Sequence, residues 1–489
     1  MIKLDFREYF DKVHACWIGK NIGGTLGAPY ESTHEYLTVT EFQTGKQQAL
    51  PNDDLDLQLV WLQAVEFSGP KNINAYTLGE YWLAFITPYW AEYGIAKNNM
   101  RRGLPPAVAG EYANVWKHSN GAWIRTEIWA TLAPAAPDIA AKYAIEDAKV
   151  DHGTGEGTVA AAFVAAMESL AFVISDVREL ISLALLRIPE DSRVAKTVRF
   201  AEQCFDEGTP LREARDAVIA LNADIGDGWF QAPSNIGFVI LGLLYGEGDF
   251  KKSMLAAVNC GDDTDCTGAT IGSVLGILGG VRGIPKDWRK QVGDTIVTAC
   301  INMGISWNPI TSCKQLSERV ARLAPAVLAE NNAQTFIGNG KTVIGAEDGQ
   351  ALRSSGFREA FSALKPYSFS MQFAFFTAEV IYRGEPVLCA GGESSIALKL
   401  YNNVKAYGNQ PYDLNIKILT PSCLETDKTE FGVFLPHWSQ LTQKYETEEI
   451  EIKVRAKGAL PPEVRIVIEI TAEGHYTSGY VPVIFLNRV

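Results

Sequence analysis

Two short acidic segments, far apart in the chain, carry the residues best suited to chemistry. The first is Asn52-Asp53-Asp54-Leu55-Asp56 and the second is Gly261-Asp262-Asp263-Thr264-Asp265-Cys266. Each is followed at once by an apolar run with the composition of a helix. Adjacent carboxylates repel, and a helix N-terminus offsets only part of that cost. A bound hard cation offsets far more, so the two segments predict a divalent-cation site if they meet in the fold.

Helix capping is the alternative for either segment taken alone, because Asp or Asn before an apolar run commonly caps a helix. Three carboxylates at one helix start exceed what capping uses, and this excess is present in both segments. The residues that we interpret as metal ligands are Asn52, Asp53, Asp54, Asp263 and Asp265. We expect Asp56 and Asp262 to be caps or supporting partners.

The expected ligand atoms are carboxylate oxygens with possible amide and hydroxyl oxygens. Oxygen ligands favour Mg²⁺, Mn²⁺ or Ca²⁺ over zinc or copper. Asp263 and Asp265 are two residues apart, so both can face one ion from a turn that enters a helix. Asp53 and Asp54 could bridge or flank the same ions. The pattern therefore indicates a pocket for one or two divalent cations.

Two glycine-containing segments have other possible meanings. His152-Gly-Thr-Gly-Glu-Gly-Thr suggests a dinucleotide loop, but such a loop follows a strand, and segment 139–150 has helical periodicity. A turn between helices fits better, with His152 as a packed polar residue. Asn120-Gly121 predicts a turn that also allows close approach of a ligand. The sequence has neither a nucleophile elbow for a Ser/His/Asp triad nor a Walker-type phosphate loop.

Residues 1 to about 325 have the pattern of a large all-α bundle, in which small residues would let backbones approach closely. Apolar segments recur with a period of about 3.6 residues, and strand signals are nearly absent. The expected helices cover 6–22, 57–67, 77–90, 137–148, 158–172, 177–186, 192–204, 211–221, 234–245, 250–258, 267–278, 286–300 and 310–328.

The pattern changes near residue 330, where β-branched and aromatic runs begin to alternate with turn residues. The expected strands cover 367–382, 395–400, 415–419, 449–456, 464–470 and 481–486. We therefore predict a helical catalytic domain over 1–328 and a smaller, sandwich-like all-β accessory domain over 331–489.

Bulk composition limits the partners and the compartment. A chain of 489 residues suggests two domains. Its net charge of −13, with no Lys/Arg run, argues against nucleic acid and an anionic membrane surface as partners. The eight cysteines form no CxxC pair, the first residues lack a signal-peptide core, and the apolar stretches are too short to span a bilayer. We expect a cytoplasmic protein, and an oligomer is possible.

Five stretches, in order, resemble motifs of the ADP-ribosylglycohydrolase family, which includes the dinitrogenase-reductase-activating glycohydrolase and the J1 crystallins. They are the small-residue helix 19–31 that ends in an acid, 52–54 in place of Thr-Asp-Asp, 120–125 like Gly-Asn-Gly-Ala-x-x-Arg, 147–152 with the histidine, and 263–265 like Asp-Thr-Asp-Thr. The resemblance covers about residues 10–300 and does not reach the C-terminal domain.

The resemblance implies an all-α fold with a binuclear Mg²⁺ centre, with Mn²⁺ as a possible replacement, and hydrolysis of a bond at C1 of a ribose. By position it implies the metal ligands named above. Its implied catalytic residues are Glu31, Asp54 and Asp263, with Glu31 as the acid that closes over the metals. Its implied substrate-binding residues are Ser119, Asn120, Gly121, Ala122 and His152. The implied substrate is a small molecule or an ADP-ribosylated protein.

Three residues depart from the family pattern: Asn52 and Cys266 replace threonines, and Leu55 replaces a hydroxyl residue. A thiol is a poor ligand for a hard cation. One metal position could be weakened or completed by water, or the substrate could differ, as in a bacterial branch of the family. The alternatives are a hydrolase of another small glycoside or nucleoside, whose β domain helps to select a carbohydrate, and a non-catalytic relative that binds metal or ADP-ribose.

Overall fold

The computed structural model describes residues 1–226, 228–302, 308–354, 357–362 and 364–487. Contacts divide the chain into two units. The first contains Met1–Gly94 and Asn114–Leu364, and the second contains Ile95–Ala113 and Lys365–Val489. These bounds differ from the expected 1–328 and 331–489, because residues 331–364 group with the helices and 95–113 with the strands. That 1–328 and 331–489 are separate domains stays a prediction.

The first unit is a helical bundle. Its helices are α1 (Phe6–Gly27), α2 (Asp53–Ser68), α3 (Ala75–Phe85), α6 (Glu127–Leu132), α7 (Pro137–His152), α8 (Glu156–Leu170), α9 (Val177–Leu185), α10 (Arg193–Asp206), α11 (Leu211–Asn222), α12 (Ala232–Tyr245), α13 (Phe250–Val258), α14 (Thr264–Gly283), α15 (Lys286–Val292), α16 (Cys313–Glu330), α17 (Ala346–Leu352) and α18 (Phe357–Ser362). Almost every residue of α8 and α12 is buried, so these apolar helices form the core. Helix α4 (Ala91–Arg101) begins in this unit and continues into the second.

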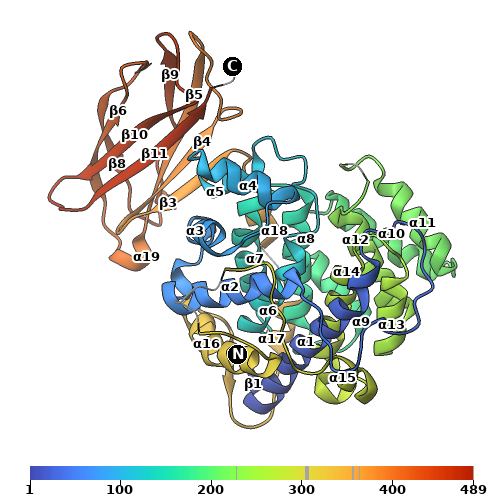
Figure 1. Ribbon diagram of the computed structural model, residues 1–489. Helices are drawn as coiled ribbons and strands as arrows, with labels where there is room; N and C mark the ends of the chain where they lie inside the picture. The colour runs from blue at the N-terminus through green and yellow to red at the C-terminus, as the bar shows by residue number, and fades with distance from the viewer. Residues whose placement is uncertain (227, 303–307, 355–356, 363, 488–489) are drawn as a thin grey trace. The chain divides into compact units, whose positions relative to one another are not determined.

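Helices α1 and α14 lie side by side because glycines remove the side chains between them (Figure 1). A Cβ on Gly19 would lie 1.9 Å from the carbonyl oxygen of Gly272, and a Cβ on Gly23 would lie 2.0 Å from that of Gly268. Four residues further along α1, Gly27 meets the start of α14. Each step of four forward in α1 matches a step of four backward in α14, so the helices are antiparallel. The end of α1 therefore meets the beginning of α14.

The second unit contains two antiparallel sheets, as the β pattern of the C-terminal region predicts. One has the strand order β11-β10-β6-β8 and the other β3-β4-β5-β9-β7. The strands are β3 (Ser368–Gln372), β4 (Phe376–Tyr382), β5 (Glu393–Asn402), β6 (Tyr412–Leu419), β7 (Leu424–Thr426), β8 (Glu430–Leu435), β9 (Ile450–Ala456), β10 (Glu463–Ala472) and β11 (Ser478–Leu486). Tyr382 of β4 joins the sheets, since its ring packs against Phe485 and its hydroxyl donates to the carbonyl of Ile484 at 2.9 Å. This unit also holds α5 (Pro106–Glu111) and α19 (Val404–Tyr407).

Several expected element bounds are wrong for identifiable reasons. Helix α15 ends at Val292 rather than Cys300, because Gly293 adopts a φ of 86°. Helix α3 ends at Phe85, since Ile86 is extended and pairs with Ile301. The single expected strand 367–382 is two strands, β3 and β4.

A small sheet was not expected from the sequence. Strand β1 (Ile2–Asp5) pairs in parallel with β2 (Thr335–Gly338), from the far end of the first unit. Helices α4, α5 and α6 were also unexpected. In the described residues no single helix is long and apolar enough to cross a membrane, although α14 with α15 passes that test as a sharply bent pair.

Candidate metal centre

Three segments meet where α1 ends and α14 begins. Glu31 follows α1, and two backbone bonds of 2.7 and 2.9 Å join residues 32–33 to Asp262, directly before α14. The third segment is the first turn of α2, where Asp54 Oδ1 lies 3.3 Å from Cys266 Sγ of α14. The two acidic segments therefore converge in the fold, and Glu31 joins them.

The side chains at these two helix starts do not cap the helices. Asn52 is the N-cap residue of α2 and Asp263 that of α14, and neither side chain makes a capping hydrogen bond within the described chain. Other helices are capped by side chains, namely those of Asp5, Asn74, Asp176, Ser192, Asp249 and Ser312. Capping therefore does not account for the acidic segments.

Two groups of ligand atoms share Asp265. Atoms of Glu31, Asp263 and Asp265 lie within 4.8 Å of one another, and so do atoms of Asp54, Asp265 and Cys266. A carboxylate that belongs to two neighbouring groups has the placement of a bridging ligand between two cations. The arrangement is suited to one or two divalent ions.

Unpaired buried oxygens show that the donor set fits a cation. Asp54 Oδ2, Asp263 Oδ1 and Asp265 Oδ1 are buried and have no hydrogen-bond partner among the described residues. All three residues are at most 5% exposed. Leaving buried charged oxygens without partners is costly, and coordination of a metal ion would remove that cost.

The pKa values of these acids reflect the same imbalance. Burial and the nearby Asp265 raise the pKa of Asp53 to about 7, and partial desolvation with Asp265 raises that of Glu31 to about 8. The pKa of Asp263 is raised well above its usual range by burial and by Asp265. Without a cation the group therefore resists full ionisation.

The centre opens into a pocket of about 490 Å³, within the usual size range for small-molecule sites. Glu31, Asp53, Asp263, Asp265 and Cys266 line it on the acidic side. Its other lining residues are Trp90, Ala91, Glu92, Tyr93, Trp116, Ser119, Asn120, Gly121, Ile124 and Phe230. The aromatic rings in this set offer flat apolar surfaces beside the carboxylates.

The loop expected to bind substrate is only partly in the pocket. Ser119, Asn120 and Gly121 line it, whereas Ala122 is buried and is not among the lining residues. Asn120 donates through Nδ2 to Asp263 Oδ2 at 2.7 Å, so it positions a candidate ligand. Gly121 has no room for a side chain, because a Cβ would lie 2.1 Å from Glu92 Oε1.

His152 lies behind the pocket wall and does not line the pocket. Its Nε2 is 3.1 Å from Ser119 Oγ and its Nδ1 is 2.9 Å from Asp151 Oδ1, and it lies close to Glu92, so it reaches the pocket through the lining residues Ser119 and Glu92. The glycines that follow serve packing: a Cβ on Gly157 would lie 2.2 Å from His152 Cδ2. Because helix α7 precedes this segment, a dinucleotide loop is excluded.

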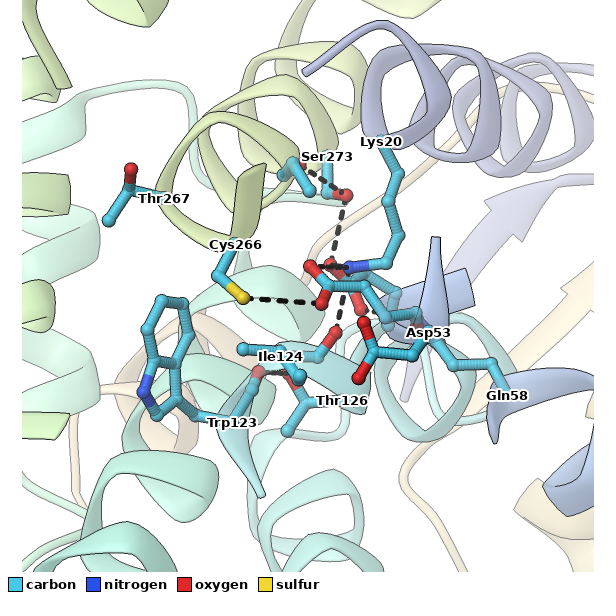
Figure 2. A network of polar contacts seen from close by, with 12 residues as sticks. Lys20, Asp53, Gln58, Trp123, Ile124, Thr126, Cys266, Thr267 and Ser273 are labelled. Atoms are coloured by element: carbon cyan, nitrogen blue, oxygen red, sulfur yellow. Dashed lines mark hydrogen bonds and ion pairs between the residues drawn. The ribbon is translucent and has the colours of Figure 1, made fainter. Parts of the chain in front are cut away.

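A buried lysine lies beside the centre. Lys20 Nζ of α1 is 3.6 Å from Asp54 Oδ2, 2.8 Å from Glu127 Oε1 and 2.7 Å from the carbonyl oxygen of Ile124. Figure 2 shows the amine reaching into a group of carboxylate oxygens, with the Cys266 sulfur directed at one of them. The carboxylates keep the pKa of Lys20 above its usual value although burial alone would lower it. Lys20 therefore compensates part of the charge of Asp54.

The remaining acidic-segment residues have supporting places. Asp56 Oδ2 accepts the backbone N–H groups of Ala299 and Cys300 at 2.7 Å, which anchors that loop. Asp262 has a φ of 64° and accepts from Asn235 Nδ2 at 2.7 Å. Both therefore support the fold around the centre, as expected, but neither caps a helix.

Asn52 and Asp53 differ in their access to the pocket. Asn52 is buried, its amide packs against Gly24, and it does not line the pocket. Asp53 lines the pocket and accepts from the Tyr93 hydroxyl at 3.2 Å, although it belongs to neither group of three ligand atoms. The ligand roles of both residues stay predictions.

Some residues at the centre had weak signals in the sequence. Lys20 stands in an apolar helical stretch, where a charged residue needs a buried partner, and this signal could have identified it. Tyr93, Trp116 and Phe230 lie in loops or at helix starts with no distinguishing pattern. Their place in the pocket follows only from the fold.

Comparisons with known proteins place the chain in a family. The model of the ADP-ribosylglycohydrolase family matches residues 6–327. Among solved structures, the chain is similar to an ADP-ribosylglycohydrolase-related protein complex, with 21% identity over 66% of this chain and 99% of that chain and a TM-score of 0.44. It is also similar to a FixG-related protein from Vibrio parahaemolyticus, with 14% identity over 23% of this chain and 97% of that chain and a TM-score of 0.17. A search of curated proteins finds no match. Since the family model spans well over half of its length, the chain belongs to the ADP-ribosylglycohydrolase family.

Proposed function

We propose that the helical unit hydrolyses the glycosidic bond at C1 of a ribose in an ADP-ribosyl group, with Mg²⁺ or Mn²⁺ held by the acidic centre. Membership of the family supports a glycohydrolase-type function. The observation that carries the finer proposal is the shared Asp265, which belongs to two groups of ligand atoms on one wall of a pocket. The proposed substrate is a small molecule or an ADP-ribosylated protein.

Each part of the pocket has a proposed task. Asp54, Asp263 and Asp265 would hold the cations, and Asn120 orients Asp263. When bound, the cations would supply Lewis-acid polarisation of a water and a grip on ribose hydroxyls. Glu31 lies at the exposed side of the centre, where its carboxylate can accept a proton from the attacking water.

The apolar side of the pocket suits the rest of the ligand. Trp90, Trp116 and Phe230 present rings that could stack on a base or on the face of a sugar. Gly121 also lines the pocket, and its missing side chain makes room for Glu92. The mixture of acids and rings matches a substrate with both hydroxyl-rich and aromatic parts.

The test combines binding with turnover. Titration calorimetry should show Mg²⁺ and ADP-ribose binding to the wild-type chain, and Asp263→Ala should abolish Mg²⁺ binding. Release of ADP-ribose from arginine- or serine-modified protein should need Mg²⁺ or Mn²⁺ and should be lost in Glu31→Gln. Glu35→Gln is the matched control, because Glu35 is an exposed acid of the same loop outside the pocket. Turnover of nitrophenyl glycosides alone would contradict the ADP-ribosyl assignment.

A further inference from the structure

Cys266 occupies an unusual place for a cysteine. It lies in the first turn of α14, is 5% exposed and lines the pocket. Its Sγ faces Asp54 Oδ1 at 3.3 Å, so the thiol points toward the acidic centre and not into apolar packing (Figure 2). With Asp54 and Asp265 it completes a group of three ligand atoms.

The other two members of this group have atoms free for a ligand. Asp54 Oδ2 and Asp265 Oδ1 are buried without a hydrogen-bond partner among the described residues. Lys20 approaches Asp54 Oδ2 only at 3.6 Å, beyond hydrogen-bond distance. One carboxylate oxygen each of Asp54 and Asp265 and the sulfur of Cys266 lie within 4.8 Å of one another.

We propose that Cys266 is a metal ligand and that its position takes a borderline or soft divalent cation, such as Zn²⁺, Co²⁺ or Cd²⁺, in preference to Mg²⁺. This proposal rests on the proposed function, whose metal centre it deepens. Thiolate sulfur binds soft and borderline cations well and hard cations poorly. The second group, Glu31 with Asp263 and Asp265, offers only oxygens and suits a hard cation. The centre would therefore be asymmetric, with Asp265 shared between unlike ions.

The binding step balances without an oxidant or reductant. The Sγ–H bond of Cys266 breaks, its proton passes to the buffer, and a bond forms between the sulfur and the cation. The hydrogen bond from Sγ to Asp54 Oδ1 is lost in the same step, which frees a second oxygen of Asp54 for the ion.

Cobalt provides a spectroscopic test that is independent of catalysis. The full chain, stripped of metal with a chelator, is titrated with Co²⁺ and followed by absorption. The wild-type chain should develop a thiolate-to-cobalt charge-transfer band in the near ultraviolet. Cys266→Ser should still bind Co²⁺ by calorimetry but should lack the band. Its affinity for Cd²⁺ should fall by at least about tenfold, while its Mg²⁺ affinity is unchanged or higher.

Two other cysteines serve as matched controls. Cys300 lies near the acidic centre without belonging to a ligand group, and Cys389 is exposed in the second unit. Cys300→Ser and Cys389→Ser should both retain the band. Loss of the band in either variant, with its retention in Cys266→Ser, would overturn the proposal. Circular dichroism melting of each variant checks that the fold is intact, and Cys266→Ala provides a second variant with the same expected loss.

The outcomes separate this proposal from the proposed function. Co²⁺ binding without a charge-transfer band would overturn the role of Cys266 and leave a hard-cation centre intact. Absence of binding for Co²⁺, Cd²⁺ and Mg²⁺ alike would overturn both.

Discussion

Two clusters of buried acids in the helical unit differ in how their charge is balanced. Arg125 is fully buried, and all three nitrogens of its guanidinium donate hydrogen bonds to carboxylates. Nε donates to Asp147 Oδ1 at 3.0 Å, and Nη1 and Nη2 donate to Asp151 at 3.1 and 2.8 Å. The guanidinium also lies over the ring of Trp82, 5.0 Å from its centroid. At the metal centre, by contrast, Asp263 and Asp265 have buried oxygens without partners.

The pKa values show the consequence. Burial would raise the pKa of Asp151, but Arg125 and His152 outweigh it and lower that pKa below its usual value. Burial raises the pKa of Asp147 to about 6 against the same arginine. At the centre, burial and neighbouring acids act together and raise the pKa of Asp263 well above its usual range. The carboxylates of the first cluster are paired with Arg125, whereas the second has Lys20 beside Asp54 but keeps buried carboxylate oxygens without a hydrogen-bond partner among the described residues.

The largest expected effect is at the cluster that is paired with Arg125. Arg125→Met should lower the free energy of unfolding by about 3–5 kcal/mol, because two buried carboxylates lose their partner. Guanidinium chloride unfolding with chelator present measures this loss. The stability of Arg125→Lys should lie between that of the wild type and that of Arg125→Met, since one ammonium cannot reproduce the two-pronged contact of a guanidinium. An unchanged midpoint in Arg125→Met would break the contrast between the clusters.

The next effect is the response of the metal centre to added cation. Mg²⁺ or Mn²⁺ at about one hundred times its dissociation constant should stabilise the wild-type chain by about 2.7 kcal/mol, because only the folded state assembles the ligands. Unfolding curves with and without the ion give the value. Asp263→Asn should lose most of this gain, and Glu35→Gln should keep it. Equal stabilisation of all three chains would place the ion elsewhere.

A third experiment compares one acid from each cluster in the absence of metal. Asp265→Asn should leave the free energy of unfolding unchanged or raise it, by about 1.4 kcal/mol for each unit of pKa shift that is relieved. Asp151→Asn should instead be less stable than the wild type, because Arg125 holds the pKa of Asp151 below its usual value and would lose this charged partner. Chemical unfolding in chelator at neutral pH measures both. A less stable Asp265→Asn would show that this carboxylate is structural.

The smallest effect is a pH dependence confined to the metal-free chain. The pKa values of Asp53 and Glu31, about 7 and about 8 when folded, exceed their usual values of 3.8 and 4.5. The folded state therefore holds more protons than the unfolded state between these values. The contribution of these two acids to stability should be largest near pH 4 and should be lost as pH rises to about 8.

Saturating Mg²⁺ should flatten or reverse this dependence, because the cation favours the ionised form. Unfolding midpoints measured across this pH range test it, and Glu31→Gln should show a weaker decline than Glu35→Gln. A metal-free midpoint that rises steadily with pH would contradict the raised pKa values.

The sequence predicts the centre better than its surroundings. The acidic excess at two helix starts identifies Asp54, Asp263 and Asp265, because local composition alone reveals charge that capping cannot use. His152 was expected near the ribose, yet it does not line the pocket and lies behind the lining residues Ser119 and Glu92. That difference depends on the packing of α7 and α8, which no motif encodes.

Long-range pairing sets a similar limit on the fold. The periodicity gives most helices, but β1 has four residues and its partner β2 lies at the far end of the first unit. A strand this short carries too little alternation to be recognised without its partner. Lys20 is an intermediate case: its place in an apolar helix indicates a buried partner, but the sequence does not show that the partners Glu127 and Asp54 come from two other helices.

The glycine contacts between α1 and α14 limit how this centre can change. A methyl group on Gly23 would lie 2.0 Å from the carbonyl oxygen of Gly268, so even alanine would force the two helices apart. Replacing a donor, as with a thiol at residue 266, alters which ion is preferred but leaves the frame intact. Inserting one residue into either helix would turn everything beyond it by about 100° and carry Glu31 away from Asp263 and Asp265. The glycines between α1 and α14 have no side chain to bind an ion, yet they fix the distance between the residues that would.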